Sequence, residues 1–219
     1  AVIAAGGAFI INTVLAIGVY FFTGSETACA TSTGVFIAPV VEETLKGLAV
    51  LAVFLFFYRE FDSVLDGILY ASMVGFGFAA TENIYYIYAR GYLEGGAAGF
   101  ILLAFIRVIV VAFQHAFYTS FTGIGFALSR LSKNPLAKFG APVAGYFVAM
   151  LTHAVHNLLG SLGSGLICIL GSVLDWTGVL GMVLLLIYLV VREGKIVAQY
   201  LRDEVGGTLT EADYRVACS

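Results

Sequence analysis

Six long runs of apolar residues, separated by short polar segments, most limit how this chain can fold. They cover roughly residues 2–22, 36–58, 63–89, 98–129, 140–160 and 165–191. Each is long enough to cross a bilayer, which takes about 20 residues in a helix. Apolar residues do not alternate with period two, as they do in barrel strands, so helices are expected. The sequence predicts an all-α fold, a polytopic transmembrane bundle of about six spans.

The charge content agrees with a lipid environment. Only 11% of the 219 residues are charged, against about 25% in an average soluble protein. We therefore expect the lipid bilayer as a partner. The net charge is −3 and no basic stripe or tail occurs, so nucleic acid is not expected as a partner. The three cysteines, Cys29, Cys168 and Cys218, lack the spacing of a metal site.

Lysine and arginine residues in the short connections predict the orientation of the chain. The residues expected on the cytoplasmic side are Arg59, Arg130, Lys133, Lys138, Arg192 and Lys195. The opposite side has only Arg90. With six spans, both termini lie in the cytoplasm, and the loops at 23–35, 90–97 and 161–164 face outward. Residues 1–192 then form the membrane domain and 193–219 a cytoplasmic tail.

Two of the runs differ from a simple span. The fourth, 98–129, exceeds the length that a bilayer needs, so it is either tilted or begins at the interface. The sixth contains Asp175-Trp176, a polar interruption at which the helix can break.

Ionisable residues inside a membrane are costly, and each therefore indicates a functional site. The second run carries Glu42, Glu43 and Lys46. Lys46 is i+4 from Glu42 and i+3 from Glu43, so it can neutralise one carboxylate and leave the other free. The alternative is an ion pair at the start of a helix, close to the interface.

The third run carries two acids in different settings. Glu82 lies some 20 residues past the start of the run, either inside the membrane or close to its outer surface. Asp66 lies near the cytoplasmic start, where a capping or solvated role is expected.

All three histidines of the chain lie in predicted spans. His115 is in the fourth, two turns after Arg107, and His153 and His156 are in the fifth. A single buried histidine is usually a packing residue, but this distribution favours a site. His153 and Asn157 are i,i+4 neighbours on one helix face, whereas His156 points elsewhere and either adds a ligand or fills space. Arg107 is either a counter-ion for the acids or extends to the interface.

The predicted topology places these polar residues in the outward-facing half of the bilayer. Glutamate and histidine bind zinc, and a glutamate in an apolar site can act as a general base. Amide or imidazole donors can hold an oxyanion. The set is typical of a hydrolytic site that activates water, although neither HExxH nor a GxSxG elbow occurs.

Five motifs resemble those of the PrsW family of intramembrane proteases, which are relatives of the type II CAAX prenyl endopeptidases. The motifs occur in order from about Ala38 to Leu159, each on its own span. They are Ala38–Gly47 with EExxK, Asp66–Tyr70, Gly75–Asn83 with FxxxEN, His115–Thr119 and His153–Asn157 with HxxxN. The second of the CAAX motifs ends in His, where this chain has Glu82.

The resemblance implies an enzyme of a prokaryotic cell membrane that cleaves single-span proteins, such as anti-sigma factors, on the extracytoplasmic side. The residues it implies as catalytic are Glu42, Glu43, Lys46, Glu82, His115, His153 and Asn157. Glu43, His115 and His153 are the expected zinc ligands, with Glu82 as a further ligand, and a metal-free glutamate mechanism is the alternative. We expect Glu42 to pair with Lys46 and Asn157 to stabilise the oxyanion.

Two other classes of protein fit part of this pattern. Carboxylates and histidines in spans also occur in ion- or proton-coupled transporters, which would show internal repeats and broken helices. A catalytically inactive scaffold that binds a partner helix through glycine-rich grooves is the third hypothesis. Two observations would discriminate between these hypotheses: the metal content of the purified protein, and whether the polar side chains meet around one cavity.

Overall fold

The computed structural model describes residues 2–218, and within that range the chain is helical without a strand. The predicted all-α fold is confirmed. By length and composition, three helical stretches can cross a membrane: Val2–Thr23, Val64–Leu131 and Gly165–Asp203. The middle stretch runs through several helical segments. The chain divides into two compact units, Ala1–Val179 and Leu180–Ser219, and the polar residues predicted to form the site lie in the first.

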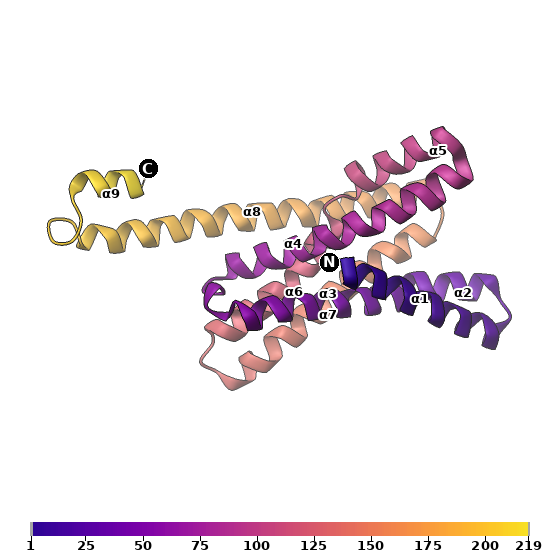
Figure 1. The fold of residues 1–219 in the computed structure, drawn as a ribbon, viewed down its shortest axis with the longest axis horizontal. Coiled ribbons are helices and arrows are strands. Elements are labelled where there is room, and N and C mark those ends of the chain that lie inside the picture. The colour runs from indigo at the N-terminus through magenta and orange to yellow at the C-terminus, as the bar shows by residue number, and fades with distance from the viewer. Residues whose placement is uncertain (1, 219) are drawn as a thin grey trace. The chain divides into compact units, whose positions relative to one another are not determined.

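The helices follow one another with short connections (Figure 1). In chain order they are α1 (Val2–Thr23), α2 (Glu26–Ser32), η1 (Thr33–Ile37), α3 (Ala38–Phe56), η2 (Tyr58–Glu60), α4 (Val64–Tyr85), η3 (Tyr86–Tyr92), α5 (Leu93–Phe105), η4 (Ile106–Val110), α6 (Gln114–Leu131), α7 (Pro135–Ser161), α8 (Gly165–Asp203) and α9 (Glu211–Ala217). The segments η1, η3 and η4 are π-helical, and η2 is a 3₁₀ turn.

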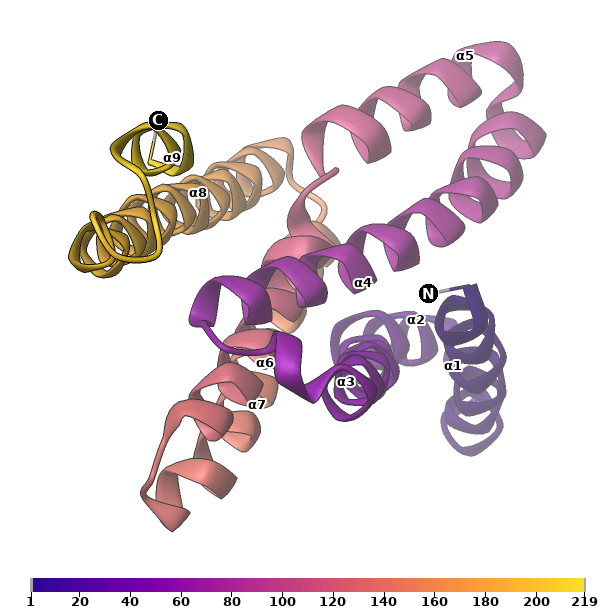
Figure 2. The same cartoon turned by 60° about the vertical axis from the view of Figure 1, so that its left-hand side comes forward.

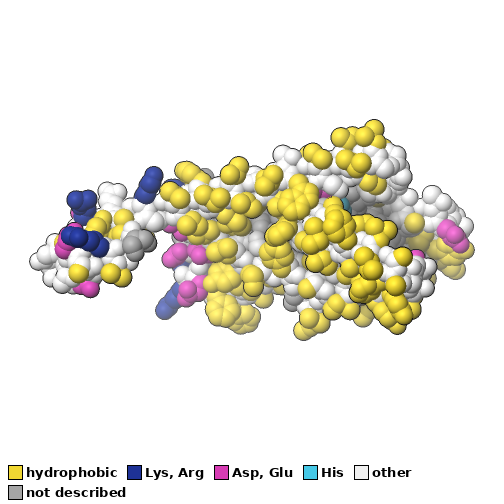
Figure 3. Space-filling model, turned by 90° about the horizontal axis from the view of Figure 1, so that it is seen from above, with side chains coloured by type: hydrophobic (Ala, Val, Ile, Leu, Met, Phe, Trp, Pro, Cys, Tyr) yellow, Lys and Arg dark blue, Asp and Glu magenta, His cyan; other side chains and the backbone are white. Residues whose placement is uncertain are grey.

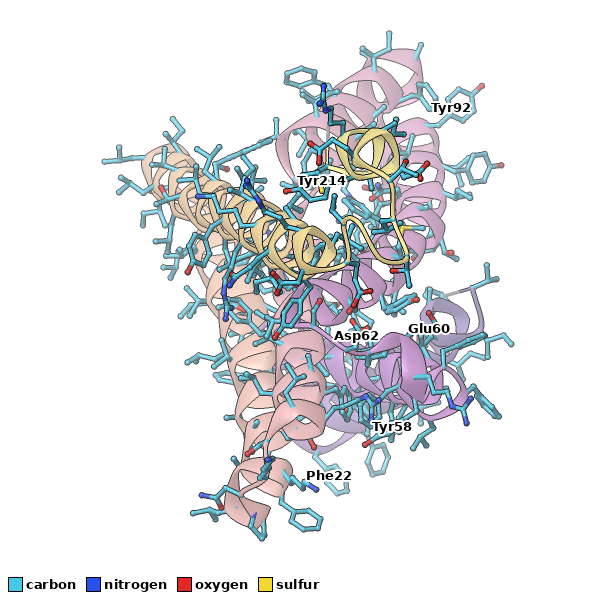
Figure 4. The ribbon with its side chains drawn as sticks, turned by 90° about the vertical axis from the view of Figure 1, so that its left-hand side faces the viewer. Phe22, Tyr58, Glu60, Asp62, Tyr92 and Tyr214 are labelled. Carbon is cyan, nitrogen blue, oxygen red and sulfur yellow. The ribbon has the colours of Figure 1, made fainter. Side chains whose placement is uncertain are left out.

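The connections α3–α4 and α6–α7 lie together at one end of the first unit (Figure 1). Tyr58, Glu60 and Asp62 belong to the first of them (Figure 4). The guanidinium of Arg130, near the end of α6, lies 3.8 Å from the ring centroid of Tyr58, which ties the two connections together. The next helix, α4, begins with a capping box between Ser63 and Asp66, so the capping role predicted for Asp66 is confirmed.

The second predicted span begins earlier than expected. A loop was expected at 23–35, but α2, η1 and α3 form a continuous helical path from Glu26 to Phe56. Pro39 lies in the first turn of α3, directly after the π-helical turn of η1. Proline lacks an N–H and crowds the preceding turn, which a wide π turn accommodates.

The predicted fourth span is two helices rather than one. It divides into α5–η4 and α6, with a non-helical break at Val111–Phe113. The backbone carbonyl freed at Val110 accepts a hydrogen bond from the indole N–H of Trp176, 2.9 Å away. The break predicted at Asp175-Trp176 is absent from α8, which runs without interruption to Asp203. A side chain of α8 thus satisfies the broken end of its neighbour.

A long antiparallel hairpin, from α4 and η3 into α5, projects at the edge of the unit (Figure 2). It folds back at Gly96, whose φ of +61° suits a residue without a Cβ, so that α5 lies along η3, and α6 crosses α4 (Figure 2). Gly67 faces the backbone of Gly123, and Gly75 faces that of Ala116. These close approaches hold α4 and α6 in register.

The distribution of side chains is the reverse of that in a water-soluble protein. Large apolar residues such as Phe22, Met73 and Phe139 are exposed, and hydrophobic side chains cover most of the visible face of this unit in Figure 3. Glu43 and Lys46, in contrast, are fully buried. The chain is an integral membrane protein with a polar interior.

Candidate active site

The predicted site residues meet where α3, α4, α6 and α7 converge. A cavity of about 120 Å³ lies among them. Its walls are Gly34, Ala38, Glu42, Ala79, Glu82, Asn83, Tyr86, Arg107, Val111, Gln114, His115, Tyr118, His153, His156 and Asn157. Each π-helical segment contributes one of these residues: Gly34 from η1, Tyr86 from η3 and Arg107 from η4. Such segments often occur at functional sites because they redirect side chains out of the helical register.

Lys46 is the central cation of the site. Its Nζ lies 2.7 Å from Glu43 Oε1 and 2.8 Å from Nδ1 of His115, with Glu42 Oε2 farther away at 3.7 Å. The ring centroid of Phe78 is 4.3 Å from the same nitrogen. We expected Lys46 to pair with Glu42, but its nearest carboxylate is Glu43. The i,i+3 partner is nearer because Lys46 also reaches across to His115 on α6.

Glu43 has partners on both carboxylate oxygens. Oε1 also receives His153 Nδ1 at 3.0 Å, and Oε2 accepts a hydrogen bond from the hydroxyl of Thr119 at 3.2 Å. A carboxylate only accepts, so the bond to Glu43 places the imidazole proton of His153 on Nδ1 and leaves Nε2 as a lone pair. Glu43 therefore bonds to Lys46, His153 and Thr119 at once, and its role as a metal ligand stays a prediction.

Glu42 is the carboxylate of the site with an unsatisfied buried oxygen, although it forms a long ion pair with Lys46. Its Oε2 is buried and has no hydrogen-bond partner among residues 2–218. It lies 3.9 Å from Nε2 of His153, and Glu42, His115 and His153 each offer a ligand atom within 4.8 Å of the others. Glutamate and histidine donors of this kind bind zinc. The oxygen of Glu42 that lacks a hydrogen bond and the Nε2 lone pair of His153 fit such an ion.

Glu82 connects the site to Arg107. One of its oxygens accepts hydrogen bonds from Arg107 and from Nε2 of His115, the latter at 3.0 Å. Arg107 Nε also donates to Asn83 Oδ1 at 2.7 Å. Of the two roles considered for Arg107, the structure therefore shows that of a counter-ion. Because the Lys46 ammonium can only donate, His115 accepts at Nδ1 and donates to Glu82 from Nε2.

Asn157 lines the same cavity as Glu82. Its Nδ2 donates to the backbone carbonyl of Gly34 at 2.7 Å and so ties α7 to η1. This bond uses one of the two amide hydrogens of Asn157. The other remains for a group in the cavity.

A second buried polar cluster supports the first and was missed by the sequence analysis. Asp175, on α8, accepts hydrogen bonds from Gln114 at 2.9 Å, from Tyr118 at 3.0 Å and from His156 at 2.7 Å. The sequence left open whether His156 adds a ligand or fills space. In the structure His156 is hydrogen-bonded to Asp175, and it also lines the cavity. The signal was present, because Asp175 is the only acid within the sixth apolar run.

The fold and the site together define a class: polytopic helical membrane proteins with a buried Glu–His centre of the kind that activates water. The sequence model of the PrsW family, described as intramembrane metalloproteases, matches residues 1–191. The chain belongs to this family, and its identification from the motifs is confirmed.

Two curated relatives carry the name Protease PrsW. The protein of Oceanobacillus iheyensis is 28% identical over 120 residues, which are 55% of this chain and 50% of the relative. That of Geobacillus kaustophilus is 30% identical over 95 residues, 43% of this chain and 38% of the relative. The matches thus span half or less of the length of these relatives. No solved structure gives a significant match.

Proposed function

We propose that this chain is an intramembrane endopeptidase that hydrolyses a peptide bond of a single-span membrane protein. The observation that carries the proposal is the Glu42 carboxylate, whose Oε2 accepts no hydrogen bond and is buried beside His153 at the wall of a polar cavity. A buried carboxylate oxygen without a hydrogen-bond partner is costly inside a membrane, so its retention indicates a chemical role. Membership of a family of intramembrane metalloproteases supports the same reaction.

The chemistry would use water held between Glu42 and the two histidines. In the metal-free form of this chemistry, Glu42 accepts a proton as the water oxygen attacks the scissile carbonyl carbon. The second amide hydrogen of Asn157 would donate to the oxyanion. The C–N bond then breaks, and the proton passes to the leaving amine nitrogen. Lys46 and Glu43 keep His115 and His153 in the required orientations.

A zinc ion is the proposed cofactor. Glu42, His115 and His153 would hold it, because a ligand atom of each lies within 4.8 Å of the others. His115 would bind through Nε2 and would first have to release the proton that it donates to Glu82. When bound, it would lower the pKa of its water and polarise the carbonyl group. Glu43, bonded to Nδ1 of His153, would act as the outer carboxylate that fixes the tautomer of a ligand histidine.

The proposed cleavage takes place on the extracytoplasmic side of the membrane. The connections that carry Arg59 and Lys133 lie at one end of the first unit (Figure 1), and the positive-inside rule places that end and both termini in the cytoplasm. His153 lies about two turns from the opposite end of α7 at Ser161. Glu82 lies about three turns from the opposite end of η3 at Tyr92.

The test is cleavage in proteoliposomes that contain the purified chain and a single-span reporter polypeptide. The reporter carries biotin on its extracytoplasmic segment and a fluorophore on its cytoplasmic end. The proposal expects a product cut near the extracytoplasmic end of the reporter span. Glu42→Gln and His153→Ala are expected to lower the rate at least 100-fold, whereas Glu94→Gln, at the exposed Arg90–Glu94 pair, retains it.

Each competing outcome has a clear meaning. Wild-type turnover by Glu42→Gln would remove the assigned chemistry. An intact reporter, together with proton or cation flux that depends on Glu42, would favour the transporter. An intact reporter that binds without turnover would favour the inactive scaffold.

A further inference from the structure

A second and larger cavity opens beside the site. It measures about 480 Å³ and lies between α1, η1, the start of α3, α4 and η3. Its walls are Ala5, Gly6, Ala8, Phe9, Asn12, Thr13, Ala16, Thr33, Gly34, Ala38, Glu42, Phe78, Thr81, Glu82, Tyr85, Tyr86 and Arg90. We call it the α1 groove. It shares five wall residues with the site cavity, Gly34, Ala38, Glu42, Glu82 and Tyr86, so a molecule in the groove reaches the Glu42 carboxylate.

The α1 groove holds polar atoms that lack partners. Asn12 Oδ1, Thr33 Oγ1 and Glu42 Oε2 are buried without a hydrogen bond in the described part of the chain, and all three residues line the groove. Other polar groups of the same walls are satisfied within their own helices. Thr13 donates to Phe9 O at 2.7 Å, and Thr81 donates to Gly77 O at 3.0 Å. The missing partners are therefore not a general property of these helices.

The unpaired atoms indicate the chemistry of the occupant. An acceptor such as Asn12 Oδ1 needs an N–H or O–H donor, and inside a bilayer a missing partner costs about 1–3 kcal/mol. The acyl chain of a lipid has no donor to offer. A polypeptide whose helix has unwound has free backbone N–H groups at each residue, and an intact helix has none within its length.

We propose that the α1 groove binds the substrate as an unwound polypeptide segment, with Asn12 and Thr33 as hydrogen-bonding partners of its backbone. The inference rests on the proposed function, and it specifies how a membrane-embedded peptide bond becomes open to attack. The mostly apolar walls receive the side chains of the segment. The shared wall at Glu42 and Glu82 then presents the unwound bond to the site.

The first experiment measures binding of the reporter polypeptide in the absence of cleavage. The photo-crosslinking residue p-benzoylphenylalanine replaces Thr13, on the wall of the groove, or Val14, which is exposed and does not line it. Both carry Glu42→Gln, so that the reporter polypeptide is held uncleaved in proteoliposomes. We expect a reporter adduct from position 13 at least fivefold above that from position 14. Equal labelling, or lipid adducts alone at position 13, would overturn the inference.

The second experiment reads catalysis. Asn12→Leu and Thr33→Val remove the unpaired groups with little change of volume, and each is expected to raise KM for the reporter about three- to tenfold with kcat nearly unchanged. The matched control is Thr23→Val, on α1 outside the groove, whose hydroxyl donates to Val19 O at 2.8 Å. KM values equal to that of the control would contradict the proposal.

Failure of the inference and failure of the proposed function give different results. If the wild-type chain leaves the reporter intact, the proposed protease activity fails, but crosslinking from position 13 still tests the groove. If the wild-type chain cleaves the reporter while position 13 gives no specific adduct, the activity stands and the groove assignment is wrong.

Discussion

The ring of Tyr118 stacks on the imidazole of His153, with centroids 5.2 Å apart and planes inclined by 19°. The hydroxyl of the same tyrosine donates to Asp175 Oδ1 at 3.0 Å. Asp175 thus holds Tyr118 from α8, and Tyr118 covers one face of a histidine of the site. Through Tyr118, the carboxylate of Asp175 positions His153, although Asp175 is not one of the proposed catalytic residues.

Tyr118→Phe is expected to lower kcat about three- to tenfold, and Tyr118→Leu about 100-fold. Phenylalanine keeps the stacked ring but loses the bond to Asp175, whereas leucine removes the stacking surface altogether. Cleavage of the reporter measures both effects. Tyr146→Phe is the matched control, because the Tyr146 hydroxyl bonds Thr44 at 2.8 Å away from the site, and its activity should equal that of the wild type. Equal loss in the two Tyr118 variants would argue against a role for the stack.

Lys46→Met is expected to lower the free energy of unfolding by about 3–5 kcal/mol. The substitution leaves the fully buried Glu43 without its nearest cation, and an uncompensated charge in a low dielectric is costly. The double variant Lys46→Met/Glu43→Gln should recover part of this loss. Reversible unfolding in mixed detergents provides the measurement.

The control for this pair is the exposed ion pair of Arg90 and Glu94, with 2.7 Å between the charged atoms. Arg90→Met is expected to change the same free energy by about 0–1 kcal/mol, because solvent screens that pair. If Lys46→Met changed the free energy of unfolding by as little as Arg90→Met does, the buried pair would not stabilise the fold.

Metal content is expected to depend on Glu42 more than on Glu43. Glu42→Gln and His153→Ala should purify with almost no zinc, whereas Glu43→Gln should retain it with an affinity about 10–100-fold weaker. The difference follows from the unpaired oxygen of Glu42 and the occupied oxygens of Glu43. Elemental analysis and competition with a chelator measure the two effects. The reverse order would restore Glu43 as the ligand, and zinc-free wild-type protein with full activity would support the metal-free mechanism.

The sequence predicted the helices and the residues that line the site, because both depend on strong local signals. Apolar runs of this length must be helical in lipid, and buried ionisable residues are too costly to occur without a role. The roles of Glu42 and Glu43 were not predictable in the same way. Adjacent residues point about 100° apart on a helix. Which of them faces the cavity depends on the rotation of α3, and contacts with Thr119 and His153 set that rotation.

The break at Val111–Phe113 also had no local signal. None of its residues is proline or glycine, and the chain can leave the helix there because Trp176, far away in sequence, satisfies the carbonyl of Val110. The polar pair Asp175-Trp176 predicted a break in its own helix. The pair instead supports the neighbouring helix, a relationship that only the tertiary contacts reveal.

Gly75→Ala is expected to lower the activity at least tenfold through the position of His115. A Cβ at Gly75 would lie 2.6 Å from the backbone oxygen of His115 and 2.7 Å from Cα of Ala116, and backbone atoms cannot rotate away as a side chain can. The start of α6 must therefore move away from α4, which draws His115 from Glu82 and Lys46. Gly140→Ala is the control, because a Cβ there meets no described atom within 4 Å and alanine favours the helix. Reporter cleavage and thermal unfolding of both variants test the claim, and wild-type activity in Gly75→Ala would show that the register of α4 and α6 does not position the histidine.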